Sequence, residues 1–281
     1  IENPLMGFSG GGMPVHIILR ANQETTTYGL PTGFSWNYGQ YIYSSGSSRY
    51  TYLNENGITQ SIVYNEETNL WEDEEGNRFT DITLGTGREV TTEDGFIYKY
   101  EANGGGFLRE IVNTTQPVHS KVIINVEHSG RINSITDSLN RYYQFNYTTS
   151  TGSDVYTSLT GYGKDGVTQT LAFSRGNLSG GLTYFKITYP DGYAVTYTQD
   201  SSNRIVKVTD ADGRYYTYKY WGDTKRVSRI TEYGSDGSKG RDYGLSYERS
   251  STVYKEYDKQ GNEIEENTII RKYNRKGDIV Y

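Results

Sequence analysis

Short runs of alternating apolar and polar residues, separated by Asn-Gly or Asp-Gly dipeptides, make up most of this chain. A period of two is typical of a strand with one face against a core, and no segment of twelve or more residues has the apolar spacing of a helix. Asn-Gly and Asp-Gly tolerate the positive φ angles of the primed two-residue turns that join antiparallel strands. The seven dipeptides begin at Asn56, Asp94, Asn103, Asp165, Asp191, Asp212 and Asp236. The pattern therefore predicts an all-β fold made of successive β-hairpins.

Tyrosine supplies much of the predicted core. The 281 residues include 29 Tyr, 8 Phe and 3 Trp, while hydrophobic residues of all kinds make up only 34%. A tyrosine ring buries a large apolar surface and keeps a polar hydroxyl at its tip. It therefore suits a thin sheet in which side chains on both faces are only partly removed from water. The absence of cysteine excludes disulfides and thiolate chemistry in this chain. The net charge of −6 gives no basic surplus for nucleic acid, and the longest apolar run, Val15–Leu19, is too short for a membrane span.

The strongest internal repeat pairs residues 131–147 with residues 204–220. The two segments align without a gap and are identical at eight of 17 positions. Each begins with Arg-Ile, passes through Thr-Asp into a turn, and resumes with Arg-Tyr-Tyr and alternating aromatic residues. One such hairpin cannot bury its apolar face alone, so neighbouring hairpins must stack. The repeat residues are Arg131, Asp137, Arg141, Tyr143, Phe145 and Tyr147 in the first copy, and Arg204, Asp210, Gly213, Arg214, Tyr216, Tyr218 and Tyr220 in the second.

This repeat resembles the YD repeats of the RHS family. Asp210-Ala-Asp-Gly-Arg214, followed by two alternate tyrosines, matches the family pattern closely, and Asp137-Ser-Leu-Asn-Arg141 matches it with Asn140 where the family prefers Gly. Degenerate copies extend the likeness, so we divide the chain into a β-rich lead-in segment, 1–88, and a YD-repeat segment, 89–281, truncated at its C-terminal end. The lead-in segment resembles the stretch that often precedes such repeats in secreted bacterial proteins.

The resemblance implies a fold and a role. In the RHS and teneurin families, YD repeats wind into a spiralling sheet that closes into a shell or barrel, and bacterial toxins of this kind enclose a C-terminal effector. By resemblance, this chain is a non-enzymatic segment of a secreted or cell-surface protein, forming shell wall or stalk around or ahead of such an effector. Its expected partners are the rest of the parent polypeptide, with further repeats, and other copies of itself.

We expect the repeat residues to be structural. The Asp of each unit is placed to accept backbone N–H bonds within its turn and to contact the Arg four residues later. The aromatic residues are expected to form rungs across neighbouring strands, each cross-strand pair adding about 0.2–1 kcal/mol. If the ring of Tyr218 is fully buried, its replacement by Ala is expected to cost about 3–5 kcal/mol.

Several motifs that carry chemistry elsewhere lack their required context here. Gly7–Gly11 matches G-x-S-x-G and Gly161–Gly166 matches G-x-G-x-x-G, but strand-like runs follow both where a helix is required. The three His residues lack metal-ligand spacing, and Asp210–Asp212 lacks the remaining ligands of a calcium loop. The acidic run Glu72–Glu75 is interpreted as a solvated turn. No catalytic residue, cofactor or metal ligand is therefore predicted.

Two other functions stay open. Exposed tyrosines, together with Trp36, Trp71 and Trp221, would stack on sugar rings in an adhesion or carbohydrate-binding β-module, whose partner is a cell-surface glycan. A hydrolase built on a propeller or solenoid would instead need carboxylates that meet in one cleft. Neither a nucleic-acid partner nor a membrane span is expected.

Overall fold

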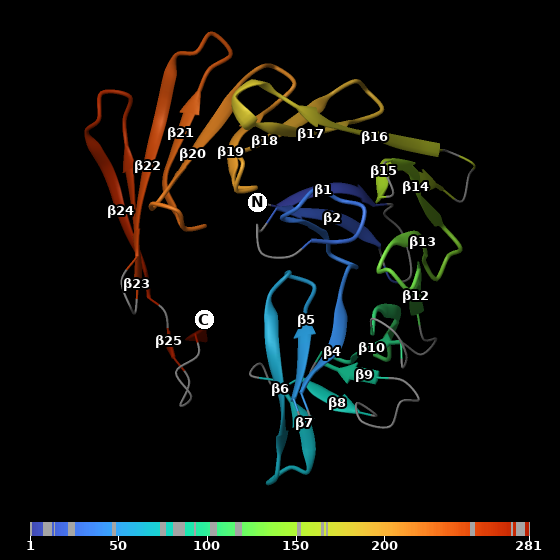
Figure 1. Ribbon diagram of the computed structural model, residues 1–281. Coiled ribbons are helices and arrows are strands. Elements are labelled where there is room, and N and C mark those ends of the chain that lie inside the picture. Colours follow the sequence, from blue (N-terminus) through green and yellow to red (C-terminus); the bar gives the residue numbers. More distant parts are fainter. Residues whose placement is uncertain are drawn as a thin grey trace. The chain divides into compact units, whose positions relative to one another are not determined.

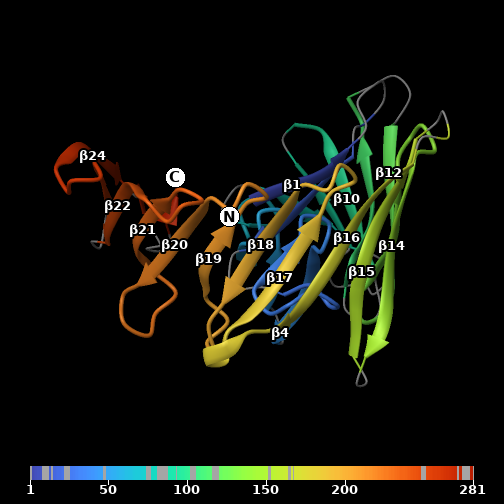
Figure 2. The same ribbon diagram turned by 90° about the horizontal axis from the view of Figure 1, so that it is seen from above.

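The computed structural model shows an all-β chain, as the alternation predicts (Figure 1 and Figure 2). It describes residues 2–280 except 8–12, 14, 22–25, 47–48, 74–76, 81–87, 93, 102–105, 116–119, 151–152, 164–165, 167, 248–250, 271 and 274–278. Within these residues, 21 strands, β4 to β24, form an antiparallel sheet in which each strand pairs with the next along the chain. The predicted series of hairpins is therefore confirmed. The helical content of the described part is one 3-10 turn, Ser179–Gly181, so no described helix has the length or apolarity to cross a membrane.

The chain folds as two compact units, Ile1–Ala172 and Phe173–Tyr281, whose boundary falls within strand β16 (Thr168–Asn177). The first unit contains the first repeat copy, and the second unit contains the second copy. The division at 88/89 marks where repeat copies begin in the sequence, and it stays a prediction. The two copies can thus be compared in two different surroundings.

The first unit combines a small three-stranded sheet with strands β4 to β16 of the large one. The small sheet has the order β1 (Glu2–Gly7), β2 (His16–Ala21), β3 (Phe34–Trp36) and is antiparallel. The strands of the large sheet that precede β16 are β4 (Tyr41–Gly46), β5 (Arg49–Leu53), β6 (Thr59–Asn65), β7 (Leu70–Glu72), β8 (Arg78–Thr80), β9 (Arg88–Thr91), β10 (Phe96–Tyr100), β11 (Leu108–Asn113), β12 (Ser120–Val126), β13 (Ile132–Thr136), β14 (Tyr142–Ser150) and β15 (Ser153–Tyr162).

Strand β4 and the preceding Gln40 also bond to the segment that leads from β10 into the first residue of β11, which closes strands β4 to β10 into a ring. The backbone N of Ile42 donates to the carbonyl oxygen of Gly106 at 3.0 Å, and the N of Leu108 donates to that of Gln40 at 3.0 Å. Gly106 has a φ of 62°, and a Cβ there would lie 1.9 Å from the Ile42 carbonyl oxygen. Only glycine therefore allows the two backbones to approach this closely.

Side chains of the small sheet fill the core of the first unit. Trp36 on β3 is 3% exposed, and its ring centroid lies 5.4 Å from that of Phe145 and 5.7 Å from that of Tyr156. Ile17 and Leu19 on β2 are buried as well. The lead-in strands thus give the hairpin β14–β15 an apolar surface to pack against, which one hairpin cannot supply for itself.

The second unit has a thinner core. Among its residues with described burial, the buried apolar side chains belong to strands up to β19, and Ile205 is the last of them along the chain. After Ile205, the buried residues in the described part are Thr231 and Asp242. Many tyrosines of these later strands are therefore half-buried or exposed. The strands are β17 (Thr183–Thr188), β18 (Ala194–Gln199), β19 (Ile205–Thr209), β20 (Tyr215–Tyr220), β21 (Val227–Tyr233), β22 (Lys239–Tyr247), β23 (Ser251–Tyr257) and β24 (Glu263–Ile270), followed by a separate pair, β25 (Lys272–Tyr273) and β26 (Ile279–Val280).

The turns between strands differ from the predicted type. In the β19–β20 turn, the N of Asp210 donates to the carbonyl oxygen of Arg214 at 2.9 Å, and the N of Gly213 donates to that of Asp210 at 3.2 Å. Gly213 has a φ of 81°, whereas Asp212 is not among the residues with positive φ. The loop is therefore a type I turn followed by one left-handed residue, not a primed two-residue turn. The prediction of primed turns was wrong because an Asx-Gly pair marks the left-handed glycine but not the loop length.

Candidate functional site

The Asp–Arg turns of the repeat are local hydrogen-bond assemblies. Oδ1 of Asp137 accepts the backbone N–H groups of Leu139 and Arg141, both at 2.9 Å, and Oδ2 accepts Nε–H of Arg141. In the second copy, Asp210 accepts the N–H of Asp212 at 3.0 Å, the N–H of Arg214 at 2.9 Å and its Nε–H at 3.0 Å. Both contacts expected within each turn are present. Each carboxylate is occupied by its own turn, and Asp212 pairs with Arg214 rather than completing a calcium loop.

Two further turns of this kind precede the repeat copies, and sequence reasoning missed them. Asp200 accepts the N–H of Arg204 at 2.9 Å and its Nε–H at 2.8 Å, and Glu127 forms an ion pair with Arg131. The overlooked signal is Asp or Glu, two variable residues, Gly or Asn, then Arg, which also occurs before the first strand of each copy. The left-handed position is held by Asn203, whose φ is 58°, in the Asp200 turn. The arginine that opens each copy therefore also closes the preceding turn.

The same arginines connect the two strands of each repeat hairpin at its open end. The guanidinium carbon of Arg131 lies 3.5 Å from the ring centroid of Tyr147, and that of Arg204 lies 5.0 Å from the ring centroid of Tyr220. The hydroxyl of Tyr220 donates to the carbonyl oxygen of Ile205 at 2.6 Å. A cation over an aromatic face is attractive, more so where water is excluded. We call this contact the arginine–tyrosine clip.

Hairpin β21–β22 carries a third clip. Arg226 lies 5.7 Å from the ring centroid of Tyr247, whose hydroxyl donates to the carbonyl oxygen of Val227 at 2.8 Å. These residues lie at the same places in their hairpin as the clip residues do in the two repeat copies. The clip is therefore a property of the hairpin unit rather than of one site.

The aromatic rungs differ in burial between the two copies. Tyr143 is 0% exposed and Phe145 is 2% exposed, whereas Tyr216, which aligns with Tyr143, is 40% exposed. Tyr218, which aligns with Phe145, is half-buried, and burial followed by its neighbours Tyr220 and Tyr216 raises its pKa to about 12. The condition of full burial that we set for Tyr218 is not met. The small sheet covers the first copy, whereas the described residues of the second unit form no equivalent layer over the second copy.

The three tryptophans do not form one binding surface. Trp36 is 3% exposed in the core of the first unit, so the expectation that it stacks on a ligand is corrected. Trp71 is half-buried between the rings of Tyr50 and Tyr64, at centroid distances of 5.3 and 5.5 Å. Trp221 is 52% exposed and donates from Nε1 to the carbonyl oxygen of Leu245 at 3.1 Å. Of the three, Trp221 alone offers a largely free ring.

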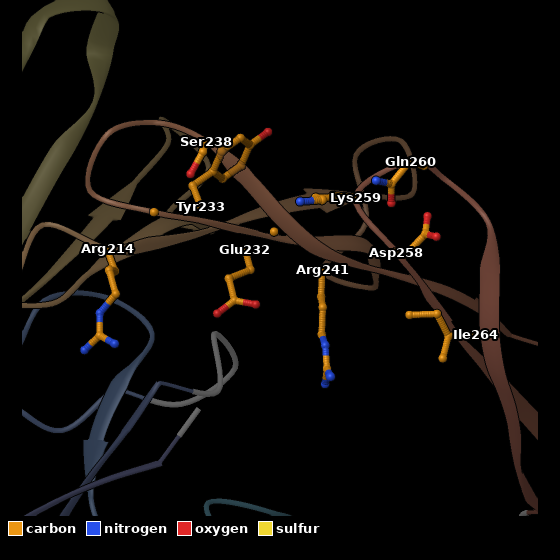
Figure 3. A pocket seen from close by; sticks show the side chains of 11 residues that line it. Arg214, Glu232, Tyr233, Ser238, Arg241, Asp258, Lys259, Gln260 and Ile264 are labelled. Carbon is orange, nitrogen blue, oxygen red and sulfur yellow. The ribbon is translucent and has the colours of Figure 1, made fainter.

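A groove of about 400 Å³ lies on strands β21, β22 and β24 of the second unit and on adjoining turns (Figure 3). The side chains of Arg214, Glu232 and Arg241 extend to the same side of the ribbon there. Both arginines have acidic partners, since Arg214 bonds to Asp210 and Asp212, and Arg241 lies 3.1 Å from Glu256. Both arginines are therefore already engaged by carboxylates of the sheet and its turns.

The other sequence motifs do not become sites in the described part of the chain. Some residues of these motifs lie outside the described residues: 8–11 of the G-x-S-x-G match, 164–165 of the G-x-G-x-x-G match, 74–75 of the acidic run, and His119. Gly161 and Tyr162 end β15, and the next element is β16, an antiparallel strand, instead of a phosphate-binding helix. Among the described residues, no three His, Asp or Glu side chains are grouped as a metal site requires.

Comparison with known proteins finds weak structural similarity only. No family model matches the chain, and no curated protein matches it. A porin-like protein from Bacteroides uniformis matches with a TM-score of 0.30 and 14% identity, over 66% of this chain and 63% of its own. The structure of TcdB2-TccC3-TEV matches with a TM-score of 0.33 and 11% identity, over 79% of this chain and 15% of its own. The chain thus spans less than two thirds of either protein.

Proposed function

We propose that this chain is a non-enzymatic structural segment of a secreted or cell-surface RHS/YD-repeat protein, forming shell wall or stalk around or ahead of a C-terminal effector. One observation carries the proposal: the motif residues that recur along the sequence bond within their own hairpins. Asp137 and Asp210 serve their turns, while Arg131 and Arg204 clip the strands that follow. Groups committed in this way hold a hairpin in shape and are not free to act on a substrate.

The unequal cores of the two units support a segment that works with neighbours. In the first unit, the lead-in strands cover the repeat hairpin, whereas the strands after Ile205 in the second unit bury few side chains. Stacked repeats stabilise one another through their interfaces, so strands with little core of their own need adjacent layers. The proposed partners are further repeats of the parent polypeptide, its C-terminal effector, and other copies of this chain.

Limited proteolysis of the parent polypeptide tests the proposal. We expect trypsin to leave residues 131–220 as one resistant fragment, because the Arg and Lys residues that the structure describes in this segment lie in paired strands or hydrogen-bonded turns. The variant Asp137→Asn should become sensitive, and the control Asp223→Asn, at an exposed site, should not. Cleavage within 131–220 of the unaltered protein at the rate of the heat-unfolded protein would overturn the structural role.

The same digest separates the two forms of the proposal. A wall that encloses the effector protects the C-terminal polypeptide until the wall unfolds. A stalk leaves that polypeptide open to cleavage while the repeats stay intact.

A further inference from the structure

A polar hollow of about 330 Å³ lies in the first unit, where three hairpin turns of the strand ring meet. The turns join β5 to β6, β7 to β8 and β9 to β10, and strand residues complete the wall. The side chains that matter here are Asn54, Glu55, Asn56, Asn77, Asp94 and Tyr98. No Lys, Arg or His occurs among the described residues that line it. The hollow therefore presents amides, carboxylates and aromatic surface without a cation.

The turns around this hollow are fixed by their own hydrogen bonds. Oδ1 of Asn54 accepts the backbone N–H groups of Asn56 and Ile58, both at 3.0 Å. Asn77 donates its backbone N–H to Oδ1 of Asp73 at 2.9 Å and its Nδ2–H to Oδ2 at 2.8 Å. These bonds use neither Nδ2 of Asn54 nor Oδ1 of Asn77. A donor and an acceptor are thus held in place before any ligand arrives, which lowers the entropic cost of binding.

Tyr98 and two carboxylates complete the arrangement. The hydroxyl of Tyr98 donates to Oε2 of Glu55 at 3.4 Å, and Glu55 is otherwise exposed. Asp94, also exposed, accepts a hydrogen bond from the hydroxyl of Thr92 through Oδ1. Burial, and then the charge of Glu55, raise the pKa of Tyr98, so its hydroxyl keeps its proton at neutral pH. Each carboxylate has acceptor capacity left for a ligand.

We propose that this hollow binds the ring of a neutral sugar. A sugar hydroxyl both donates and accepts, and amides and carboxylates answer both needs, while an aromatic ring suits the apolar face of the sugar. With two carboxylates and no cation in the described lining, an acidic sugar is repelled. The volume is at the lower end of ligand pockets, which range from about 300 to 1,000 Å³. The site uses none of the three tryptophans and does not depend on the proposed structural role.

Saturation-transfer NMR with the methyl glycosides of glucose, galactose, mannose and N-acetylglucosamine tests the proposal. We expect at least one of them to bind the wild-type chain in the millimolar range, and methyl glucuronide to bind more weakly than methyl glucoside. The double variant Glu55→Gln, Asp94→Asn should weaken binding about tenfold or more, since hydrogen bonds to charged groups are lost. Asn56→Ala, which changes an exposed turn side chain and leaves the fold intact, should weaken it as well.

The control removes one carboxylate and one tyrosine hydroxyl at another turn. The double variant Asp191→Asn, Tyr193→Phe alters exposed residues of the β17–β18 turn and should bind as the wild type does. The proposal is overturned if no glycoside binds, if binding survives in both hollow variants, if the glucuronide binds as well as the glucoside, or if calcium alone occupies the site. Hydrolysis of nitrophenyl glycosides would contradict the non-enzymatic role while leaving the sugar site standing.

Discussion

At the scale of single residues, the carboxylates of this chain act by collecting several donors at once. Asp242 is a fully buried example, at 0% exposure. Its oxygens accept Nε–H of Arg229 at 2.9 Å, Nζ–H of Lys239 at 2.8 Å and the hydroxyl of Thr231 at 2.8 Å. Burial alone would raise the pKa of Asp242, but these three donors outweigh burial and hold the pKa well below its usual value.

The pH dependence of stability follows from that shift. A carboxylate whose pKa is lower in the folded state stabilises the fold above its unfolded-state pKa of about 3.9, and this contribution is lost as pH falls through the folded-state pKa. We expect Asp242→Asn to lower the free energy of unfolding by about 1.5–3 kcal/mol at pH 7 and by much less at pH 2. Urea denaturation at both pH values measures this. The control Asp223→Asn should change little, and an equal loss at both pH values would show that charge is not the cause.

The Asp–Arg turn gives a matched pair of substitutions at two levels of burial. The side chains of Asp137 and Arg141 are 0% and 5% exposed, whereas those of Asp210 and Arg214 are 24% and 61% exposed. Removing one partner of a buried pair leaves an uncompensated charge, so Asp137→Asn should cost about 3–5 kcal/mol. The exposed pair is screened by solvent, so Asp210→Asn should cost about 1 kcal/mol or less. Thermal unfolding of both variants tests this, and similar losses would contradict it.

At the scale of elements, the two repeat hairpins share their turns and clips, but they differ in how much other strands bury their aromatic residues. Phe145 on β14 and Tyr218 on β20 hold the same place in the repeat, yet Phe145 is 2% exposed and Tyr218 is half-buried. We therefore expect Phe145→Ala to cost about 3–5 kcal/mol. Tyr218→Ala should cost about 1–2 kcal/mol, because less apolar area leaves water when that ring packs. Chemical denaturation of the two variants checks this difference. A larger loss of unfolding free energy for Tyr218→Ala than for Phe145→Ala would contradict the deeper burial of Phe145.

The features that sequence predicts are those encoded locally. Alternation and Asx-Gly pairs predict the hairpins because strand faces and turn residues depend on near neighbours. The burial of each copy could not be predicted, because it depends on residues far away in the sequence. Phe145, for example, packs against Trp36, which lies more than a hundred residues earlier. The hollow was missed for a related reason: Asn54, Asn77 and Asp94 come from separate turns that the strand ring brings together. The Asp200 turn was different, because its motif is local and readable.

At the scale of the whole molecule, the two units contain one kind of hairpin supported to different degrees. The strands around the first repeat copy bury apolar side chains on both β13 and β14, such as Ile135 and Tyr143, each 0% exposed. The strands after Ile205 are held together by clips, turns and ion pairs in addition to their backbone hydrogen bonds. In the described part of the chain, the residues they bury are Thr231 and Asp242. Local stability depends on buried apolar contacts as well as on backbone hydrogen bonds. Because the two units bury different amounts of apolar surface, we expect their strands to open with different free energies.

Hydrogen exchange of the backbone amides in the intact chain measures that difference most directly. If the repeated residues are architecture whose strength comes from what covers them, amides of β12 to β15 should exchange slowest and those of β21 to β24 fastest, although both sets lie in paired strands. Asp137→Asn should then speed exchange throughout β13 and β14. Equal protection of the two sets, or unchanged exchange in that variant, would contradict a structural role for the repeat.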